Sequence, residues 1–241
     1  ANFEVDGFEF VAINAGPEFR PNPSISFFLN FDPSRDPDAL EHLDATWSGL
    51  VDGGAELMPL DSYDFSQHYA WVQDRFGVNW QLMLTNPAGD PRPFVVPSLM
   101  FTGEVRNRAE EAMEFYADLF AGKANVTARY PEQTQLANAG SVTYGDMNLF
   151  GQWIAVMDSP VEHAFAFDPG VSLQVNATGQ AELDRFWDAL STVPEAEQCG
   201  WCVDKFGVSW QVIPDNLGEL MASPGSYAKL MGMKKIDISA F

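Results

Sequence analysis

Two glutamines, Gln81 and Gln211, stand at the end of two similar stretches of the chain. Trp71–Gln81 reads WVQDRFGVNWQ, and Trp201–Gln211 reads WCVDKFGVSWQ. The turn in each stretch is already set by its Asp and Gly, so turn formation does not require the amide. A buried amide must find hydrogen-bond partners. Each glutamine therefore either bonds neighbouring groups inside a sheet or faces a cleft and binds a ligand or water.

A histidine and two cysteines are the other residues with reactive side chains. His163 follows Glu162 in a loop entering a strand, where it is either a ligand or general base, or a loop residue packing on Phe165. Cys199 and Cys202 form a CxxC motif on a predicted strand, whose alternation points them to opposite faces. We interpret them as packing cysteines, since redox pairs open a helix and two thiols alone do not close a zinc site.

The glutamine motifs belong to a longer internal repeat. Residues 10–17 (FVAINAGP) match 153–160 (WIAVMDSP), residues 24–30 (SISFFLN) match 170–176 (GVSLQVN), and amphipathic helical patterns follow at 38–53 and 180–193. The second copy begins near residue 96 with a strand, a helix over 108–119 and a further strand. The first copy lacks such a beginning, so we expect either an omitted N-terminal segment or another element in that place.

Alternation of side chains predicts which residues share a face. Val78–Leu84 reads as a strand after a turn opened by Asp74, and the second copy repeats this with Asp204. Trp80 and Trp210 then face away from the adjacent glutamines, toward a helix layer. If the glutamines face a cleft, the residues two positions away join them there. The candidate ligand-binding residues are Gln81, Gln211, Asn79, Ser209 and Met83, with His163 added from the loop.

Proline and glycine mark the predicted domain boundaries. Residues 86–97 hold a Pro-rich run typical of an interdomain linker. The sequence predicts a first domain at 1–90, a second at 96–214 and a helical tail at 215–241. Asp38 is the predicted cap of the first-copy helix.

Composition limits the function classes. The 241 residues include 34 Asp and Glu against 13 Lys and Arg, a formal net charge of −21. This surface repels phosphate backbones and anionic lipid, so we expect neither nucleic-acid nor membrane partners. No apolar run approaches the ~18 residues of a membrane span, and no leader opens the chain. We therefore expect a cytoplasmic globular protein.

Three motifs resemble the PhnB-like family, often labelled 3-demethylubiquinone methyltransferase-like. They are QCGWCVDKFGVSWQVIP, GGAELMPLDSYDF with WVQDRFGVNWQL, and MDSPVEHAFAFDPGVSLQVN, and GEVRNRAEEAMEFYADLF is similar to that family's opening helix. The resemblance implies an α+β fold of the glyoxalase/bleomycin resistance/vicinal-oxygen-chelate superfamily. Its tandem glyoxalase-like domains would consist of βαβββ modules that form curved mixed sheets around a cleft. No glycine-rich strand-to-helix turn for a methyl-donor nucleotide is present.

The resemblance also indicates where a metal would bind. Superfamily enzymes place His, Glu or Gln ligands on the first and last strands of each module. The matching positions fall near Pro97, Val156, Gly170 and Gln211 in one copy, and near Ile13, Ser24 and Gln81 in the other. Only the glutamines are ligand types, and a neutral amide alone holds no metal. We therefore expect no metal and no cofactor, and the family's inward last-strand position favours glutamines that face the cleft.

Three functions fit these observations. The preferred one is binding of a small organic molecule in the cleft without a metal. The alternatives are a metal-dependent lyase, isomerase or dioxygenase-type enzyme, which a metal titration would reveal, and a structural oligomer with a vestigial cleft. We expect a homodimer, because the shortened first copy would otherwise expose unpaired strand edges and superfamily relatives build sheets across subunits.

Overall fold

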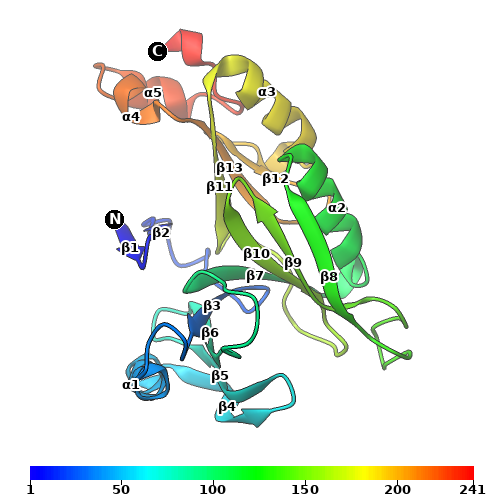
Figure 1. Ribbon diagram of the computed structural model, residues 1–241. Helices are drawn as coiled ribbons and strands as arrows, with labels where there is room; N and C mark the ends of the chain where they lie inside the picture. The colour runs from blue at the N-terminus through cyan, green and yellow to red at the C-terminus, as the bar shows by residue number, and fades with distance from the viewer. The chain divides into compact units, whose positions relative to one another are not determined.

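The computed structural model describes all 241 residues, which form two compact units, Ala1–Ala166 and Phe167–Phe241. Figure 1 shows helices and strands mixed along the chain in both units. Unit 1 holds a two-stranded hairpin of β1 (Asn2–Val5) and β2 (Phe8–Val11) and an eight-stranded sheet. Unit 2 holds a three-stranded sheet. The predicted α+β class is confirmed.

The eight-stranded sheet consists of two βαβββ modules. The first contains β3 (Ile25–Phe31), α1 (Ala39–Val51), β4 (Ala55–Tyr63), β5 (Ser66–Gln73) and β6 (Asn79–Leu84). The second contains β7 (Val95–Phe101), the 3-10 helix η1 (Gly103–Val105), α2 (Ala109–Leu119), β8 (Lys123–Arg129), β9 (Val142–Leu149) and β10 (Gln152–Asp158). The strand order is β4-β5-β6-β3-β7-β10-β9-β8. The first and last strands of each module pair in parallel, and β3 pairs with β7 antiparallel.

The central β3–β7 pair joins elements from the two copies of the repeat. Its register runs from Ile25 opposite Leu99 to Leu29 opposite Val95. The sheet therefore crosses the Pro-rich segment, and β7 includes the last residues of the predicted linker. The compact units divide after Ala166, whereas the division predicted from the repeat is 1–90, 96–214 and 215–241. The physical reason is that β3 hydrogen-bonds across the segment and ties its two sides into one sheet.

Both helices of unit 1 cover the same face of the sheet. His68 on β5 contacts Asp44 of α1, so the face of β5 that carries His68 lies under α1. On β9, a Cβ at Gly145 would lie 2.8 Å from the methyl group of Met113 in α2, which places Gly145 under α2. The register between neighbouring strands places His68 and Gly145 on the same face of the sheet. Leu82 and Leu99 lie on this face and are completely buried. The opposite face is called here the helix-free face.

Unit 2 repeats the module in shortened form. It contains β11 (Ser172–Ala177), α3 (Gly179–Leu190), the 3-10 helix η2 (Pro194–Ala196), β12 (Trp201–Val203) and β13 (Ser209–Pro214). Its strand order is β11-β13-β12, with β11 parallel to β13. The tail adds α4 (Leu217–Leu220), α5 (Ser226–Met231) and η3 (Ile238–Ala240), which confirms the predicted tail helices.

The tail is attached to its own unit. The Lys235 ammonium lies 2.8 Å from the Asp184 carboxylate of α3. The amides of Cys199 and Gly200 donate to the carbonyls of Met233 and Lys234. The only adjacent basic pair in the chain, Lys234–Lys235, therefore holds the tail against unit 2.

The repeated hairpin forms as predicted. Asp74 Oδ1 accepts from the amides of Phe76 and Val78, and Asp204 Oδ1 accepts from Phe206 and Val208. The second carboxylate oxygen accepts from the indole of the tryptophan six residues later, at 3.0 Å in the first copy and 2.8 Å in the second. The Asp of each motif thus fixes both the turn and the tryptophan.

Two local predictions differ from the structure. Asp38 precedes α1 but makes no side-chain capping hydrogen bond. Cys199 does not lie on a strand. It and Gly200 have φ of 52° and 87° in a tight turn, where Gln198 and Trp201 exchange backbone hydrogen bonds. Cys199 and Cys202 are both free thiols, and burial raises the pKa of Cys202 to about 12.

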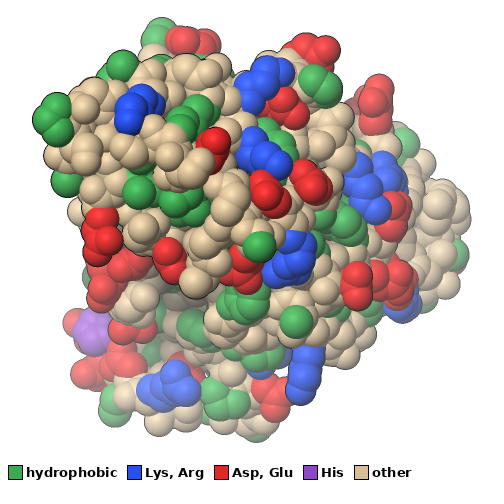
Figure 2. All heavy atoms as spheres, turned by 90° about the horizontal axis from the view of Figure 1, so that it is seen from above, with side chains coloured by type: hydrophobic (Ala, Val, Ile, Leu, Met, Phe, Trp, Pro, Cys, Tyr) green, Lys and Arg blue, Asp and Glu red, His purple; other side chains and the backbone are tan.

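The surface carries both signs of charge despite the net negative balance. Acidic side chains are spread over the face shown in Figure 2, and several basic side chains lie beside them. No helix is both long enough and apolar enough to cross a bilayer.

Candidate functional site

Gln81 lies on the helix-free face, and both ends of its amide are bonded. The Tyr69 hydroxyl donates to Gln81 Oε1 at 2.6 Å. Gln81 Nε2 donates to Ser26 Oγ at 2.8 Å. All three side chains are buried, with Gln81 only 3% exposed. The amide is therefore fixed by residues from three neighbouring strands.

These contacts extend into a line of polar side chains across the middle of the sheet. Ser98 on β7 stands directly opposite Ser26 on β3, so it shares the helix-free face. Tyr69, Gln81, Ser26 and Ser98 are called here the polar line. Ser98 is 1% exposed, yet its hydroxyl has no hydrogen-bond partner. Trp71, opposite Gln81 on β5, has a buried indole nitrogen that is also unpartnered.

Apolar side chains surround the polar line. Phe28, Val96 and Ala155 are buried in the same cluster as Tyr69. The partly buried side chains packed against that cluster are Met58, Tyr63, Trp71, Met83, Tyr144, Trp153 and Met157. Burial raises the pKa of Tyr144 to about 12, so this phenol is neutral at ordinary pH. The face combines a polar centre with an aromatic and thioether periphery.

A charged group lies at one end of this face. Arg92 pairs with Asp146 at 2.8 Å and stacks over the Trp153 ring at 4.1 Å. Asp146 and Trp153 also line an open pocket of about 670 Å³ together with Lys123, Asn125, Asn148 and Phe150. The Arg92 charge is already matched by Asp146, so this end offers polarity with little net charge.

The residues on this face do not fit the divalent metal that the resemblance implies. Register places Ser98 and Ala155, not the neighbouring Pro97 and Val156, on the face that carries Gln81. With Ser26, the donor set is two hydroxyls and one amide, all neutral, whereas divalent metals in proteins need anionic or imidazole ligands. The structure holds no group of three or more His, Cys, Asp or Glu side chains arranged for a metal.

The second glutamine has a similar but simpler setting in unit 2. Gln211 Nε2 donates to Ser172 Oγ at 2.8 Å, the counterpart of the contact between Gln81 and Ser26. No tyrosine hydroxyl binds Gln211, because Cys199 stands at the place matching Tyr69. Ser209 lies opposite Ser172, and its buried hydroxyl is unpartnered.

The predicted candidates thus separate into three groups. Asn79 and Met83 lie with Gln81 on one face of β6, and Ser209 lies with Gln211 on β13. Asn79 is buried, donates to the Gly77 carbonyl and leaves its Oδ1 unpartnered. The structure does not bring His163 to these strands.

His163 lies in the loop after β10. Its Nε2 is 2.6 Å from Ser159 Oγ, and its ring packs on Phe165 with centroids 4.6 Å apart. Burial, and then the charge of Arg106, lower the pKa of His163. The ring is therefore mainly neutral at neutral pH.

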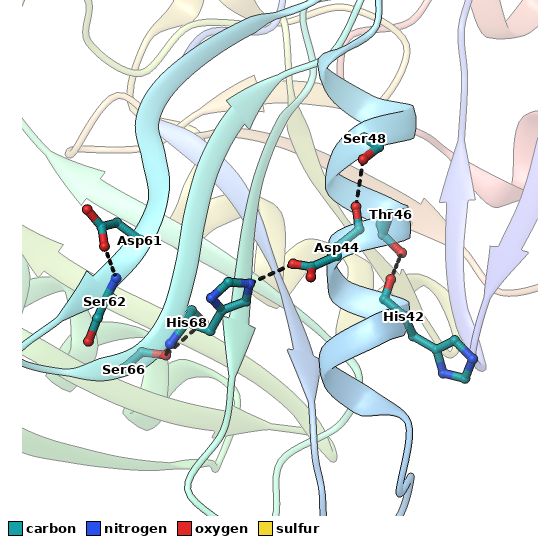
Figure 3. A network of polar contacts seen from close by, with 8 residues as sticks. All are labelled: His42, Asp44, Thr46, Ser48, Asp61, Ser62, Ser66 and His68. Atoms are coloured by element: carbon teal, nitrogen blue, oxygen red, sulfur yellow. Dashed lines mark hydrogen bonds and ion pairs between the residues drawn. The ribbon is translucent and has the colours of Figure 1, made fainter.

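The remaining histidines form pairs with carboxylates on the helix side. His68 Nε2 lies 2.6 Å from Asp44, and Figure 3 shows this contact between β5 and α1. The nearby Ser66 hydroxyl bonds the backbone carbonyls of His68 and Leu84, not the His68 ring. His42 pairs with Asp36 at the exposed surface. None of these pairs presents a nucleophile to an imidazole.

Sequence reasoning missed the residues that complete the polar line. Ser26 had a readable signal, since it is one of the identical residues in the aligned segments SISFFLN and GVSLQVN, where it matches Ser172. Trp71 had the same kind of signal, because it matches Trp201 in the repeated motif, whereas Tyr69 and Ser98 had none. They join the site only through the pairing of β5 with β6 and of β3 with β7.

The paired βαβββ modules and repeated Gln–Ser contacts define a tandem-module protein of the α+β class. Residues 1–83 and 93–213 match the family model described as 3-demethylubiquinone-9 3-methyltransferase, so the chain belongs to this PhnB-like family. No curated protein is significantly similar to it.

Three solved bacterial structures are similar to part of this chain. A PhnB protein from Bacillus cereus, provisionally described as a 3-demethylubiquinone-9 3-methyltransferase, is 35% identical with a TM-score of 0.40, covering 48% of this chain and 95% of that one. A Staphylococcus aureus protein is 39% identical with a TM-score of 0.21, covering 25% and 47%. A Pseudomonas aeruginosa protein is 19% identical with a TM-score of 0.37, covering 48% and 94%.

Proposed function

We propose that the chain binds a small organic molecule on the helix-free face of unit 1, without the metal of the glyoxalase superfamily. The paired βαβββ modules support placement in that superfamily. The observation that carries the proposal is the pair of buried polar atoms without partners, Ser98 Oγ and Trp71 Nε1, on the face that holds Gln81.

The energetics favour a ligand at these atoms. A buried donor or acceptor without a partner costs about 1–3 kcal/mol. A molecule with an acceptor for the Trp71 indole N–H and a polar group for the Ser98 hydroxyl would remove both costs. Trp153, Met157 and Tyr144 offer apolar surface for the rest of such a molecule. An apolar site with a few convergent polar groups is typical of small-molecule binding.

A structural role is the second candidate, because one observation favours it. Gln81 is satisfied by Tyr69 and Ser26, and Phe28, Val96 and Ala155 are buried by their own neighbours. A face filled by its own side chains needs no ligand. The family description names a methyltransferase, but the site has no feature that favours methyl transfer.

Binding is tested with benzamide, whose amide can pair with the Ser98 hydroxyl and whose ring suits the apolar periphery, and with toluene, which lacks the amide. Tryptophan fluorescence titrations should show benzamide binding more tightly than toluene. Ser98→Ala should weaken benzamide binding, whereas Ser62→Ala, at an exposed serine of β4, should not.

One combination of results would overturn the binding proposal. If neither compound nor a broader set of small amides and carbonyl compounds binds, and Ser98→Ala raises the melting temperature, the structural role replaces the binding role. Stabilisation is then expected because the substitution removes an unsatisfied hydroxyl.

A further inference from the structure

The open pocket that Asp146 lines in unit 1 contains one lysine without a partner. The charged lining residues are Lys123 and Asp146, and Arg92 pairs with the Asp146 carboxylate at 2.8 Å. The other lysines of the chain form ion pairs, donate to a carbonyl or lie over a ring. Lys123 makes none of these contacts. The pocket therefore carries one unmatched positive charge in a chain with a net charge of −21.

Strand pairing places this lysine in a row of three side chains on the helix-free face. The register carries the face of Ser98 across β10 to Asp146 on β9. Asn148, two residues further along β9, shares that face. It stands opposite Lys123 on β8 and opposite Trp153 on β10. The row thus presents an ammonium, an amide and an indole ring on three neighbouring strands.

The turn after β9 orients the amide of Asn148. Its Oδ1 accepts from the Gly151 amide at 3.1 Å, whereas its Nδ2 has no partner in the chain. The free end of this side chain is therefore a donor. Directly opposite residues of antiparallel strands have Cβ atoms about 4.5–5.5 Å apart. The Lys123 ammonium and the Asn148 amide can therefore donate to the two oxygens of one carboxylate.

Aromatic side chains adjoin these two donors. Trp153 stands next to Asn148 in the row, and the Arg92 guanidinium lies over the Trp153 ring at 4.1 Å. Phe150, in the turn between β9 and β10, also lines the pocket and is 66% exposed. The buried Asp146 holds Arg92 in place through their ion pair. The pocket thus combines two donors for an anion with apolar surface for a ring.

We propose that this pocket binds a small aromatic carboxylate, whose oxygens accept from Lys123 and Asn148 and whose ring contacts Trp153. The one unmatched cation balances one negative charge, which suits a monoanion. A phosphate dianion would bring its second charge close to the Asp146 carboxylate without a counter-ion, so the two would repel each other. The ring adds burial of apolar area, which a bare anion does not have.

This site is separate from the one proposed around Ser98. Asn148 lies on β9, two strands away from β7, which is about 10 Å across the sheet. A molecule of the size of benzoate reaches one of the two sites but does not span both. Only the Trp153 ring adjoins both sites, and their polar contacts differ. Failure of benzamide to bind at Ser98 therefore leaves the carboxylate site standing, and the reverse also holds.

The test titrates the full-length protein with three compounds. Benzoate has the ring and the charge, benzyl alcohol has the ring without the charge, and inorganic phosphate has charge without the ring. Nuclear magnetic resonance follows the side-chain amide of Asn148 and the indole of Trp153. Benzoate should shift both signals and bind at least roughly fivefold more tightly than either other compound. Added sodium chloride should weaken benzoate binding, because it screens the Lys123 charge.

Substitutions of two lysines provide the matched comparison. Lys123→Gln should weaken benzoate binding roughly fivefold, whereas Lys123→Arg keeps the charge and should retain most of the affinity. Lys205→Gln, at an exposed lysine of unit 2, should leave the affinity unchanged. Lys123 is also exposed, so its variants should fold as the wild type does, and their melting temperatures check this.

Three results would overturn the carboxylate site. The first is an Asn148 amide signal that benzoate does not shift. The second is equal benzoate affinity in the wild type and in Lys123→Gln, since the lysine then takes no part. The third is phosphate or benzyl alcohol that binds as tightly as benzoate, since charge and ring then do not act together.

Discussion

Gln81 and Gln211 hold matching positions but differ in how completely their amides are bonded. Gln81 is bonded by Tyr69 and Ser26 and is buried, whereas Gln211 bonds only Ser172 and is partly exposed. Water therefore has access to Gln211 but not to Gln81. The same residue type in the same motif should therefore contribute differently to the free energy of unfolding in the two units.

Replacing each glutamine by leucine should reveal the difference between the two contributions. Gln81→Leu leaves the buried Tyr69 and Ser26 hydroxyls without their partner, so we expect a loss of about 1–3 kcal/mol in unfolding free energy. Gln211→Leu should cost less than about 1 kcal/mol, because water replaces the amide. Urea denaturation of both variants measures the difference. Equal losses would contradict the assigned contacts.

The two hairpin aspartates allow a second comparison between the copies. Asp74 and Asp204 make the same turn and indole contacts, but Asp204 is 2% exposed and Asp74 is half-buried. Asp204→Ala should therefore destabilise the protein more than Asp74→Ala, with the larger loss about 2–3 kcal/mol. Thermal unfolding monitored by tryptophan fluorescence checks the order. A reversed order would show that burial does not control the strength of this motif.

At the level of single residues, the sequence predicted the Asp turn motif better than it predicted the residues around Gln81. The roles of Asp74 and Asp204 follow from turn chemistry, which is local. The partners of Gln81 come from β5 and β3, so they depend on register, which no local pattern encodes. The prediction that Cys199 of the CxxC motif lies on a strand was wrong. Cys199 has a positive φ in a tight turn, which is unusual for a residue with a side chain.

Among the elements, α2 shows how a helix end is stabilised from outside. Arg108 precedes the helix and provides no side-chain cap. Asp158, at the end of β10, accepts from the amides of Ala109 and Val142 at 3.2 Å and 3.0 Å. This carboxylate therefore joins the α2 N-terminus to two strands. Burial raises the pKa of Asp158, against the lowering effect of these hydrogen bonds.

The raised pKa predicts a pH effect of defined sign. The folded protein holds the Asp158 proton more tightly than the unfolded chain, whose carboxyl has a pKa near 3.8. The resulting stability is present below that pH and is lost as pH rises through the folded pKa. Relative to Asp158→Asn, the wild type should lose stability over this window and then level off. Urea midpoints of the two proteins measured from pH 3.8 upward check this, and a constant difference would contradict it.

Element positions were largely readable from the sequence, whereas their pairing was not. The periodicity at 108–119 gave α2 nearly to the residue, since its buried stripe is strong. Strand β4 was not foreseen, because most of its side chains are exposed and show no alternation. The pairing of β3 with β7 was also unreadable, because it joins residues far apart in the chain and no local pattern encodes it.

For the whole molecule, the division after Ala166 predicts which fragments fold. Residues 1–166 contain all eight strands of the large sheet and both its helices, so this fragment should unfold cooperatively and show near-ultraviolet dichroism. Residues 1–90 leave the β3 edge without β7 and should be unfolded or aggregated. Solution spectra of the two fragments decide between this division and the one that follows the repeat. A folded 1–90 fragment would favour the repeat as the folding unit.

Net charge gives a prediction for the homodimer that the sequence analysis expects. Each copy carries −21, so long-range repulsion opposes association and added salt screens it. The dissociation constant should therefore fall as sodium chloride rises from low to moderate concentration. Sedimentation at several salt concentrations measures this dependence. Weaker association with added salt would contradict this and would indicate an interface held by opposite charges.

The position of β7 after the Pro-rich segment also has a consequence for protein synthesis. A ribosome adds about 5–20 residues per second. The β3–β6 module is therefore complete for a second or more before β7 has emerged from the exit tunnel. During that interval the inner edge of β3, with the apolar run ISFFLNF, has no partner. The nascent chain is thus most exposed to aggregation and to chaperone binding at this stage, and a translational pause before β7 leaves the tunnel would lengthen this interval.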